Sequence, residues 1–326
     1  MIRLPPFRYL APRSLEKAVA MKAEHGREAM YVAGGTDLFP NLKRRQFEPM
    51  VLIGLRGLQE LRGISNGRGL TIGAGTTLSE VANHSQVRAQ YPSLARAAGL
   101  VSSPPLRNMG TIGGNLCVDT RCTYYNQSHA WRKALGFCMK KDGEVCWVAL
   151  SSPDCLAVSS SDCAPVAISL GAQVRLVGPQ GERMVPAEAL YRNDGMQYLK
   201  LWPDEVLVSI HLPPMQGWRT SYLKLRRRGS IDFPILGVAV ALRLEEDGAC
   251  TEARLVLGAV ASQPVSVPEA AGLLIGQRIT AELVNEAAEL AARHARPLDN
   301  TDMGLSYRKK MARVYVGRAL AEAAGK

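Results

Sequence analysis

The first half of the chain alternates short helical and extended patterns, and glycine-rich turns follow the extended segments. Residues 14–25 are typical of a helix with Ser14 as its N-cap. Thr77 and Glu80 have the spacing of a capping box that would begin another helix. Short apolar runs at 29–33, 50–53 and 69–74 predict strands. This alternation indicates a fold that mixes α and β elements.

Residues 116–161 interrupt this pattern. They are rich in Cys, Ser and Lys and show little periodicity, which predicts an irregular insertion. Regular patterns resume after it, with a helix over 164–170, a strand over 173–177, a turn over 178–181 and a strand over 206–212.

From Trp218 onward, predicted strands come first and predicted helices follow. The strands lie at 221–226, 236–244 and 253–260, with a hairpin turn at 246–248, and the helices at about 267–274, 280–295 and 305–323. Strands followed by helices indicate a separate α+β domain. We therefore expect one domain over 1–217 and a second over 218–326.

Composition and charge exclude several classes of protein. Of the 326 residues, 47% are hydrophobic and 21% are charged, which is ordinary for a folded protein. The formal net charge is +11, but Lys and Arg are spread along the chain and no aromatic residues alternate with the basic clusters, so nucleic-acid binding is not expected. The start lacks the apolar core of a signal peptide and no apolar run could span a bilayer. We expect a cytoplasmic protein without membrane contact.

The seven cysteines are unevenly distributed, with six of them between residues 117 and 163. An odd count without a signal peptide argues against a disulfide framework. Within the insertion, Cys122, Cys138, Cys146 and Cys155 are separated by 15, 7 and 8 residues, a spacing that identifies no particular metal. Four thiolates in a loop of low apolar content still favour a site that folds around metal. A structural zinc, an iron–sulfur cluster and free thiols all remain open.

Two glycine pairs are candidates for binding a ligand. Residues 33–37 (AGGTD) follow a predicted strand, and residues 111–115 (TIGGN) form the second element. Glycines let the backbone approach a ligand and leave amide N–H groups for a pyrophosphate, although a tight structural turn explains each motif as well. Neither motif is a Walker A loop or a G-x-G-x-x-G fingerprint, so the usual signatures for ATP and NAD are missing.

Four segments together resemble the FAD-binding subunit of the molybdenum hydroxylases, which include xanthine dehydrogenase, carbon monoxide dehydrogenase and 4-hydroxybenzoyl-CoA reductase. They are VAGGTDL (32–38), IGAGTTL (72–78), RNMGTIGGNL (107–116) and SDCAPV (161–166). The resemblance implies an α+β, two-subdomain FAD-binding fold of the vanillyl-alcohol-oxidase type, with subdomains at about 1–57 and 58–217. It also implies a C-terminal α+β domain like that of the carbon monoxide dehydrogenase flavoprotein.

The resemblance also implies which residues hold FAD. The pyrophosphate would lie on the two glycine elements, namely Ala33, Gly34, Gly35, Thr36 and Asp37 together with Thr111, Gly113, Gly114 and Asn115. Asp162 would also bind FAD, Val101 would lie near the isoalloxazine ring, and Lys224 matches a basic position near the flavin. A cation there suits the negative charge of a reduced flavin, although a surface lysine on a strand is the alternative.

The insertion resembles the one in the FAD subunit of 4-hydroxybenzoyl-CoA reductase, which carries a [4Fe–4S] cluster. This likeness implies Cys122, Cys138, Cys146 and Cys155 as the cluster ligands. Cys117 and Cys163 adjoin the flavin motifs, and we expect both to be small buried residues, although either could substitute as a ligand.

The implied function is electron transfer, with no catalytic residue in this chain. A molybdopterin-binding large subunit and a [2Fe–2S] small subunit would complete a heterotrimer that is expected to dimerise. Reduced ferredoxin would supply electrons through the cluster and FAD to molybdenum, where 4-hydroxybenzoyl-CoA becomes benzoyl-CoA. Three alternatives remain open: the same subunit in an oxidative hydroxylase, a non-redox module with a Cys₄ zinc, and an independent flavin reductase that uses NAD(P)H.

Overall fold

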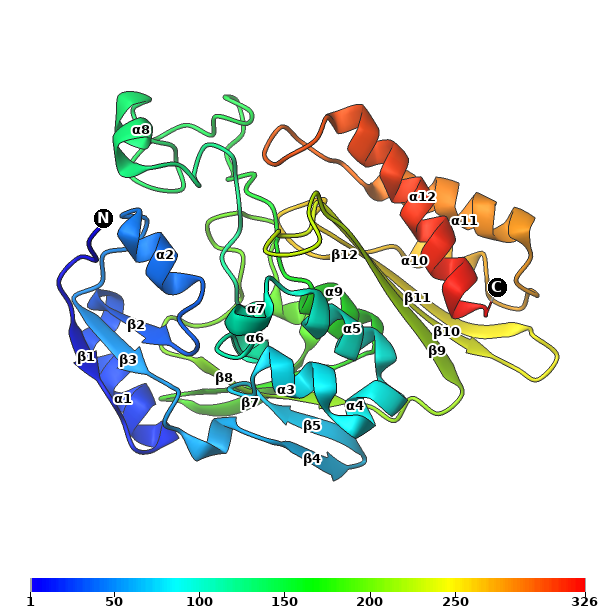
Figure 1. Cartoon of the computed structure of the whole chain (residues 1–326), viewed down its shortest axis with the longest axis horizontal. Helices are drawn as coiled ribbons and strands as arrows, with labels where there is room; N and C mark the ends of the chain where they lie inside the picture. Colours follow the sequence, from blue (N-terminus) through cyan, green and yellow to red (C-terminus); the bar gives the residue numbers. More distant parts are fainter. Residues whose placement is uncertain (1, 326) are drawn as a thin grey trace.

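The computed structural model describes residues 2–325, which form three regions that each contain one β-sheet (Figure 1). The first region has a parallel sheet of order β1-β3-β2, made of β1 (Arg8–Leu10), β2 (Ala29–Val32) and β3 (Val51–Gly54). Helix α1 (Leu15–His25) connects β1 to β2, and the predicted cap is confirmed because the Ser14 side chain accepts a hydrogen bond from the Lys17 amide. Helix α2 (Leu38–Lys43) follows the first glycine turn.

The second region has an antiparallel sheet of order β4-β5-β8-β6-β7. Its strands are β4 (Ile64–Gly67), β5 (Gly69–Gly73), β6 (Gln173–Gly178), β7 (Gly181–Pro186) and β8 (Val206–Leu212). Its helices are α3 (Leu78–Asn83), α4 (Ser85–Gln90), α5 (Pro92–Leu100), α6 (Pro104–Arg107), α7 (Ile112–Leu116) and α9 (Cys163–Ser169). The predicted capping box between Thr77 and Glu80 begins α3, so this local prediction is confirmed.

The third region has an antiparallel sheet of order β12-β11-β10-β9. Its strands are β9 (Trp218–Leu225), β10 (Leu236–Leu244), β11 (Cys250–Gly258) and β12 (Val265–Ser266), and its helices are α10 (Pro268–Gly272), α11 (Ala281–His294) and α12 (Leu305–Ala323). Short 3₁₀ turns elsewhere occupy Gly26–Glu28, Gln59–Leu61 and Ala187–Leu190.

Both faces of this third sheet are covered, which explains the nearly continuous apolar run of β10. Val238, Val240 and Leu242 point into a core shared with α11 and α12. Ala239 and Ala241, on the opposite face, belong to a core that includes α5 and α9. Because side chains alternate along a strand, the small alanines allow the second region to pack closely against this sheet.

The insertion at 116–161 is irregular as predicted, apart from helix α8 (His129–Ala134), whose N-cap is Ser128. All three regions hold it. The Gln46 side chain donates to the Tyr125 carbonyl (2.7 Å), the Gly195 amide donates to the Cys155 carbonyl (2.7 Å), and the Thr123 amide donates to the Asn300 carbonyl (2.9 Å). Hydrogen bonds from its backbone to distant segments thus replace regular secondary structure in ordering this loop.

No helix within residues 2–325 combines the length and the apolar character that crossing a membrane requires.

Candidate functional site

The first glycine element (33–37) lies against Met109 and Gly110, the two residues that directly precede the second element (111–115). A methyl group on Gly34 would lie 2.0 Å from the Met109 carbonyl oxygen, and one on Gly110 would lie 3.3 Å from the Thr36 hydroxyl. Gly35 has a φ of +71°, which glycine adopts at low cost. Ala33 directly follows β2, so the end of this strand fixes the position of the glycine turn. Only residues without a side chain permit so close an approach.

The second glycine element begins α7 and is braced by the segment at 72–78. Thr111 is the N-cap, and its hydroxyl accepts a hydrogen bond from the Gly114 amide (3.1 Å). A methyl group on Gly113 would lie 2.5 Å from the Ala74 side chain, and the Gly113 amide donates to the Ala74 carbonyl (2.9 Å). The structure therefore brings three of the four motif segments together.

The fourth segment, SDCAPV, joins them through Asn115. The Asn115 side-chain oxygen accepts hydrogen bonds from the Ser161 hydroxyl (2.8 Å) and from the Cys163 amide (3.0 Å). Asn115 and Ser161 are both buried. The Asn115 side-chain oxygen thus fixes the start of α9 through hydrogen bonds, a structural role that the motif alone did not reveal.

Asp162 and Lys224 form a buried ion pair beside this contact. Lys224 Nζ lies 2.8 Å from one carboxylate oxygen, and the Tyr222 hydroxyl donates to the other at 2.7 Å. The Lys224 side chain is 1% exposed, so the alternative of a solvated surface lysine was wrong. Lys224 also donates to the Leu100 carbonyl (3.1 Å), next to Val101 at the end of α5. Lys224 therefore links Asp162 to the backbone directly before Val101.

Desolvation raises the pKa of the Asp162 carboxyl, although the Lys224 ammonium and the Tyr222 hydroxyl act in the opposite direction.

Changing Asp162 to Asn should leave the Lys224 ammonium buried without its counter-charge. We expect this variant to lose about 3–5 kcal/mol of unfolding free energy, measured by urea denaturation. The double variant Asp162→Asn, Lys224→Met should recover much of the loss, and a double variant no more stable than Asp162→Asn would contradict the pairing.

Asp37, the last residue of the first glycine element, pairs with a residue that the sequence did not single out. The Arg121 guanidinium contacts its carboxylate, and the Asn41 amide donates to the same group at 3.0 Å. The Arg121 side chain is 7% exposed, and burial lowers its pKa to about 10, so it stays charged at neutral pH. Arg121 lies at the start of the insertion and carried no sequence signal, because an isolated arginine between Thr120 and Cys122 matches no motif.

The four cysteines predicted as metal ligands line one small cavity inside the insertion. Their side chains are all buried, and Tyr124, Met139, Trp147 and Val148 complete much of its wall. The space left between the side chains is about 10 Å³, so the thiols and their apolar neighbours close on one another. Within residues 2–325, no three His, Cys, Asp or Glu side chains converge as ligands of a single metal ion would. The insertion gathers the four thiols without arranging them around one atom.

Burial also governs the chemistry of these thiols. It raises the pKa of Cys122 to about 11 and that of Cys155 to about 12, and the neighbouring Cys146 adds to both shifts. Thiols of this kind are poor nucleophiles, so they do not fit a reactive-cysteine site. Cys117 and Cys163 do not line the cavity, and Cys163 is fully buried in the core that includes α9, as expected of a small apolar residue.

Comparisons with known proteins agree with this arrangement of motifs. Residues 5–215 match the family described as the FAD binding domain in molybdopterin dehydrogenase, and residues 220–323 match the CO dehydrogenase flavoprotein C-terminal domain. The carbon monoxide dehydrogenase medium chain of Hydrogenophaga pseudoflava is 31% identical over 97% of this chain and 96% of its own length. The FAD-binding subunit of an Escherichia coli aldehyde oxidoreductase is 32% identical over 79% of this chain and 82% of its own length.

Solved structures extend the likeness to the whole fold. Carbon monoxide dehydrogenase from Hydrogenophaga pseudoflava superimposes with a TM-score of 0.80 at 30% identity, over 99% of this chain and 98% of the other. Quinoline 2-oxidoreductase from Pseudomonas putida 86 superimposes with a TM-score of 0.80 at 25% identity, over 99% and 98%. The predicted α+β fold with a C-terminal flavoprotein-type domain is confirmed, and the chain belongs to the family of FAD-binding medium subunits of the molybdenum hydroxylases.

Proposed function

We propose that this chain is the FAD- and [4Fe–4S]-carrying electron-transfer subunit of a 4-hydroxybenzoyl-CoA reductase-type complex in the cytoplasm. The observation that carries the proposal is the gathering of Cys122, Cys138, Cys146 and Cys155 around one cavity in a flavin subunit. We also propose a domain boundary at 217/218, between β8 and β9.

The two glycine elements would hold the pyrophosphate of FAD. The contact of Gly34 with Met109 and Gly110 supports this arrangement, because these two residues lead directly into Thr111–Asn115, and backbone amides at glycine turns suit a diphosphate. The side chains of Asp37, Asn115 and Asp162 already bind protein groups, so they would serve mainly to fix these backbone segments. Lys224 would place a positive charge near the flavin, whose reduced form is anionic.

The donor set of the cysteine cavity fits an iron–sulfur cluster better than a zinc ion. Zinc binds four thiolates at about 2.3 Å, so its ligands must converge on one point. A four-iron cluster is larger, and its thiolates bind separate iron atoms. Four thiols line a shared cavity, and in the part of the chain described no three of them converge on a single ion; because the space between them is about 10 Å³, they would move apart to admit the cluster. Bound there, the cluster would supply one-electron transfer, and the aromatic and apolar wall would exclude water.

Gly195 provides a test of how tightly the cavity is built. A methyl group on it would lie 2.8 Å from the Cys155 sulfur and 2.7 Å from the Ala157 amide nitrogen. We expect Gly195→Ala to lower the iron content by more than about half, because Cys155 must move, while FAD content stays unchanged. Iron analysis and flavin absorbance measure both quantities. Gly229→Ala is the control, since nothing lies within 4 Å of that position; equal iron in both variants would contradict the prediction.

The remaining parts of the reaction would lie on partner subunits. We propose a molybdopterin-binding large subunit and a [2Fe–2S] small subunit, assembled as a dimer of heterotrimers, with ferredoxin as electron donor. Electrons would enter at the cysteine site, pass to FAD and leave toward molybdenum on the partner subunit. There, two electrons and two protons would remove the phenolic hydroxyl of 4-hydroxybenzoyl-CoA as water and give benzoyl-CoA. A flavin exchanges one or two electrons, so it can link carriers of different electron number.

The second candidate is the same subunit in an oxidative hydroxylase. It is favoured by the similarity of this chain to subunits of carbon monoxide dehydrogenase and of an aldehyde oxidoreductase. In that case electrons would leave through this chain instead of entering it. The cysteine site would then serve as an exit relay.

The direction of the reaction can be tested on the intact complex, purified anaerobically through an affinity tag on this chain. With a dithionite-reduced viologen as donor, we expect 4-hydroxybenzoyl-CoA to be converted to benzoyl-CoA, detected by chromatography. A complex that forms no benzoyl-CoA but reduces an oxidising dye with an aldehyde as substrate would refute the reductase assignment in favour of the oxidative one.

A further inference from the structure

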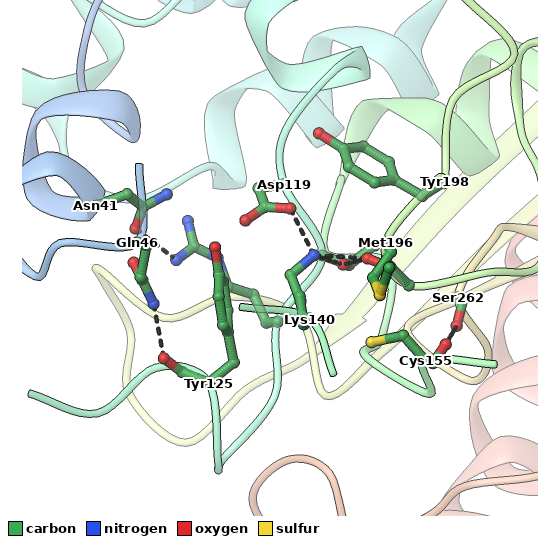
Figure 2. A network of polar contacts seen from close by, with 12 residues as sticks. Asn41, Gln46, Asp119, Tyr125, Lys140, Cys155, Met196, Tyr198 and Ser262 are labelled. Atoms are coloured by element: carbon green, nitrogen blue, oxygen red, sulfur yellow. Dashed lines mark hydrogen bonds and ion pairs between the residues drawn. The ribbon is translucent and has the colours of Figure 1, made fainter. Parts of the chain in front are cut away.

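Lys140 brings a buried positive charge to the wall of the cysteine cavity. It is one of the residues that line the cavity, and its side chain is 4% exposed. Figure 2 shows this side chain among Asp119, Tyr125, Tyr198 and Cys155. A lysine in such a position is unusual, because burying an ammonium group is costly unless its charge and its hydrogen bonds are satisfied.

The hydrogen-bonding capacity of Lys140 is fully used by the protein. Its Nζ donates to an Asp119 carboxylate oxygen (2.8 Å), to the Thr120 hydroxyl (2.6 Å) and to the Gly195 carbonyl (2.5 Å). An ammonium group has three donors, so none is left for a ligand of the cavity. Lys140 therefore influences the contents of the cavity through its charge.

Two aromatic rings shield that charge from water. Lys140 Nζ lies 4.9 Å from the ring centroid of Tyr125 and 5.5 Å from that of Tyr198, within the range of cation–π attraction. Removing water lowers the local dielectric constant, which strengthens the field of the ammonium group over short distances. The two rings therefore fix the position of the ammonium group and strengthen its electrostatic field at the cavity.

Lys140 and the cavity share a direct structural link through Gly195. The Gly195 carbonyl accepts from Lys140, and its amide donates to the Cys155 carbonyl at 2.7 Å. Of the two residues in the Lys140–Asp119 ion pair, only Lys140 lines the cavity, so the positive charge is the one nearer the thiols.

We propose that Lys140 is a positioning residue whose fixed charge raises the reduction potential of the group held by the four cysteines; this inference rests on the proposed function. Each electron that enters an iron–sulfur cluster adds one negative charge to a group already surrounded by thiolates. A cation held nearby stabilises the reduced form more than the oxidised form, and net charge near a cluster is a known determinant of its potential. Lys140 would thus make the site a better electron acceptor.

The test compares the cluster midpoint potential in matched variants of the full chain, measured by anaerobic redox titration with EPR detection. Lys140→Met, and the double variant Lys140→Met, Asp119→Asn that removes both charges of the pair, should have a lower potential than the wild type. Lys140→Arg should keep a potential near that of the wild type. Lys141→Met is the control, because that side chain is 27% exposed and its charge is screened by solvent.

The outcomes separate this inference from the proposed function. A wild-type chain that binds no iron refutes the proposed function itself. Iron-loaded Lys140→Met and double variants with the wild-type potential would refute only the role of Lys140. Loss of iron from every Lys140 variant, including Lys140→Arg, would also refute it, since the residue would then act through packing. If Lys140→Met loses its iron while Lys140→Arg keeps both its iron and the wild-type potential, the result would support a need for a positive charge beside the cluster.

Discussion

Replacing Gly34 by alanine is expected to abolish FAD binding. The added methyl group would lie 2.0 Å from the Met109 carbonyl oxygen and 2.9 Å from the Gly110 Cα, both of which are backbone atoms that cannot turn aside. The two glycine elements would have to separate, and their amides could no longer bind one diphosphate. We expect FAD affinity to fall by at least about 100-fold, equivalent to about 2.7 kcal/mol, measured by flavin fluorescence on titration of the apoprotein.

Gly57→Ala is the matched control for this prediction. Nothing lies within 4 Å of a methyl group at Gly57, and its backbone does not require glycine. It should bind FAD as the wild type does. Wild-type affinity in a folded Gly34→Ala variant would show that the contact between the two turns is not needed to hold the cofactor.

Changing Cys138 to Ser is expected to remove iron while leaving FAD in place. Cys138 is 8% exposed and lines the cavity, so its loss takes away one of four thiolates from a closed site. The flavin motifs belong to other segments of the chain, and their mutual contacts do not involve Cys138. We expect iron to fall from about four to below about one per chain, with FAD near one per chain, measured on anaerobically purified protein.

Cys250→Ala is the control for the cysteine prediction. Cys250 is fully buried at the start of β11, within the core shared with α11 and α12, and it does not line the cavity. This variant should keep its iron. Equal loss of iron and FAD from Cys138→Ser would mean that the insertion acts as a folding element of the subunit and not as an electron relay.

Local chemistry made part of the fold predictable. The helix capped by Ser14 and the capping box at Thr77 depend on interactions between residues three apart, so sequence alone was sufficient. Strand β1 was missed because it has only three residues and pairs with β3, more than 40 positions later. Strand β7 was missed because none of its residues is buried and it contains a glycine, two charged residues and a proline, so it shows no alternating apolar pattern. Strand β1 depends on long-range pairing with β3, and β7 depends on the hairpin that it forms with the preceding strand β6.

The same distinction applies to the site. The glycine elements could be identified because each forms a short local motif, whereas the four cysteines were singled out by their clustering in the insertion and by a family resemblance. The Asp162–Lys224 pair joins residues 62 positions apart, and the bond between them exists only because α9 packs on the third sheet. Arg121 and Lys140 belong to an insertion without periodicity, so nothing in the sequence indicated that their charges are buried beside Asp37 and the cysteine cavity. The partners of these buried charges are determined by how the chain folds, and not by the residues next to them in sequence.

The most direct measurement is the flavin and metal content of the wild-type chain, purified under anaerobic conditions and analysed for FAD, iron, acid-labile sulfide and zinc. We expect about one FAD, four iron and four sulfide per chain, as one cubane cluster requires. A folded chain that holds FAD and a single zinc ion, or that takes up no iron on reconstitution with iron and sulfide, would contradict the proposed iron–sulfur site.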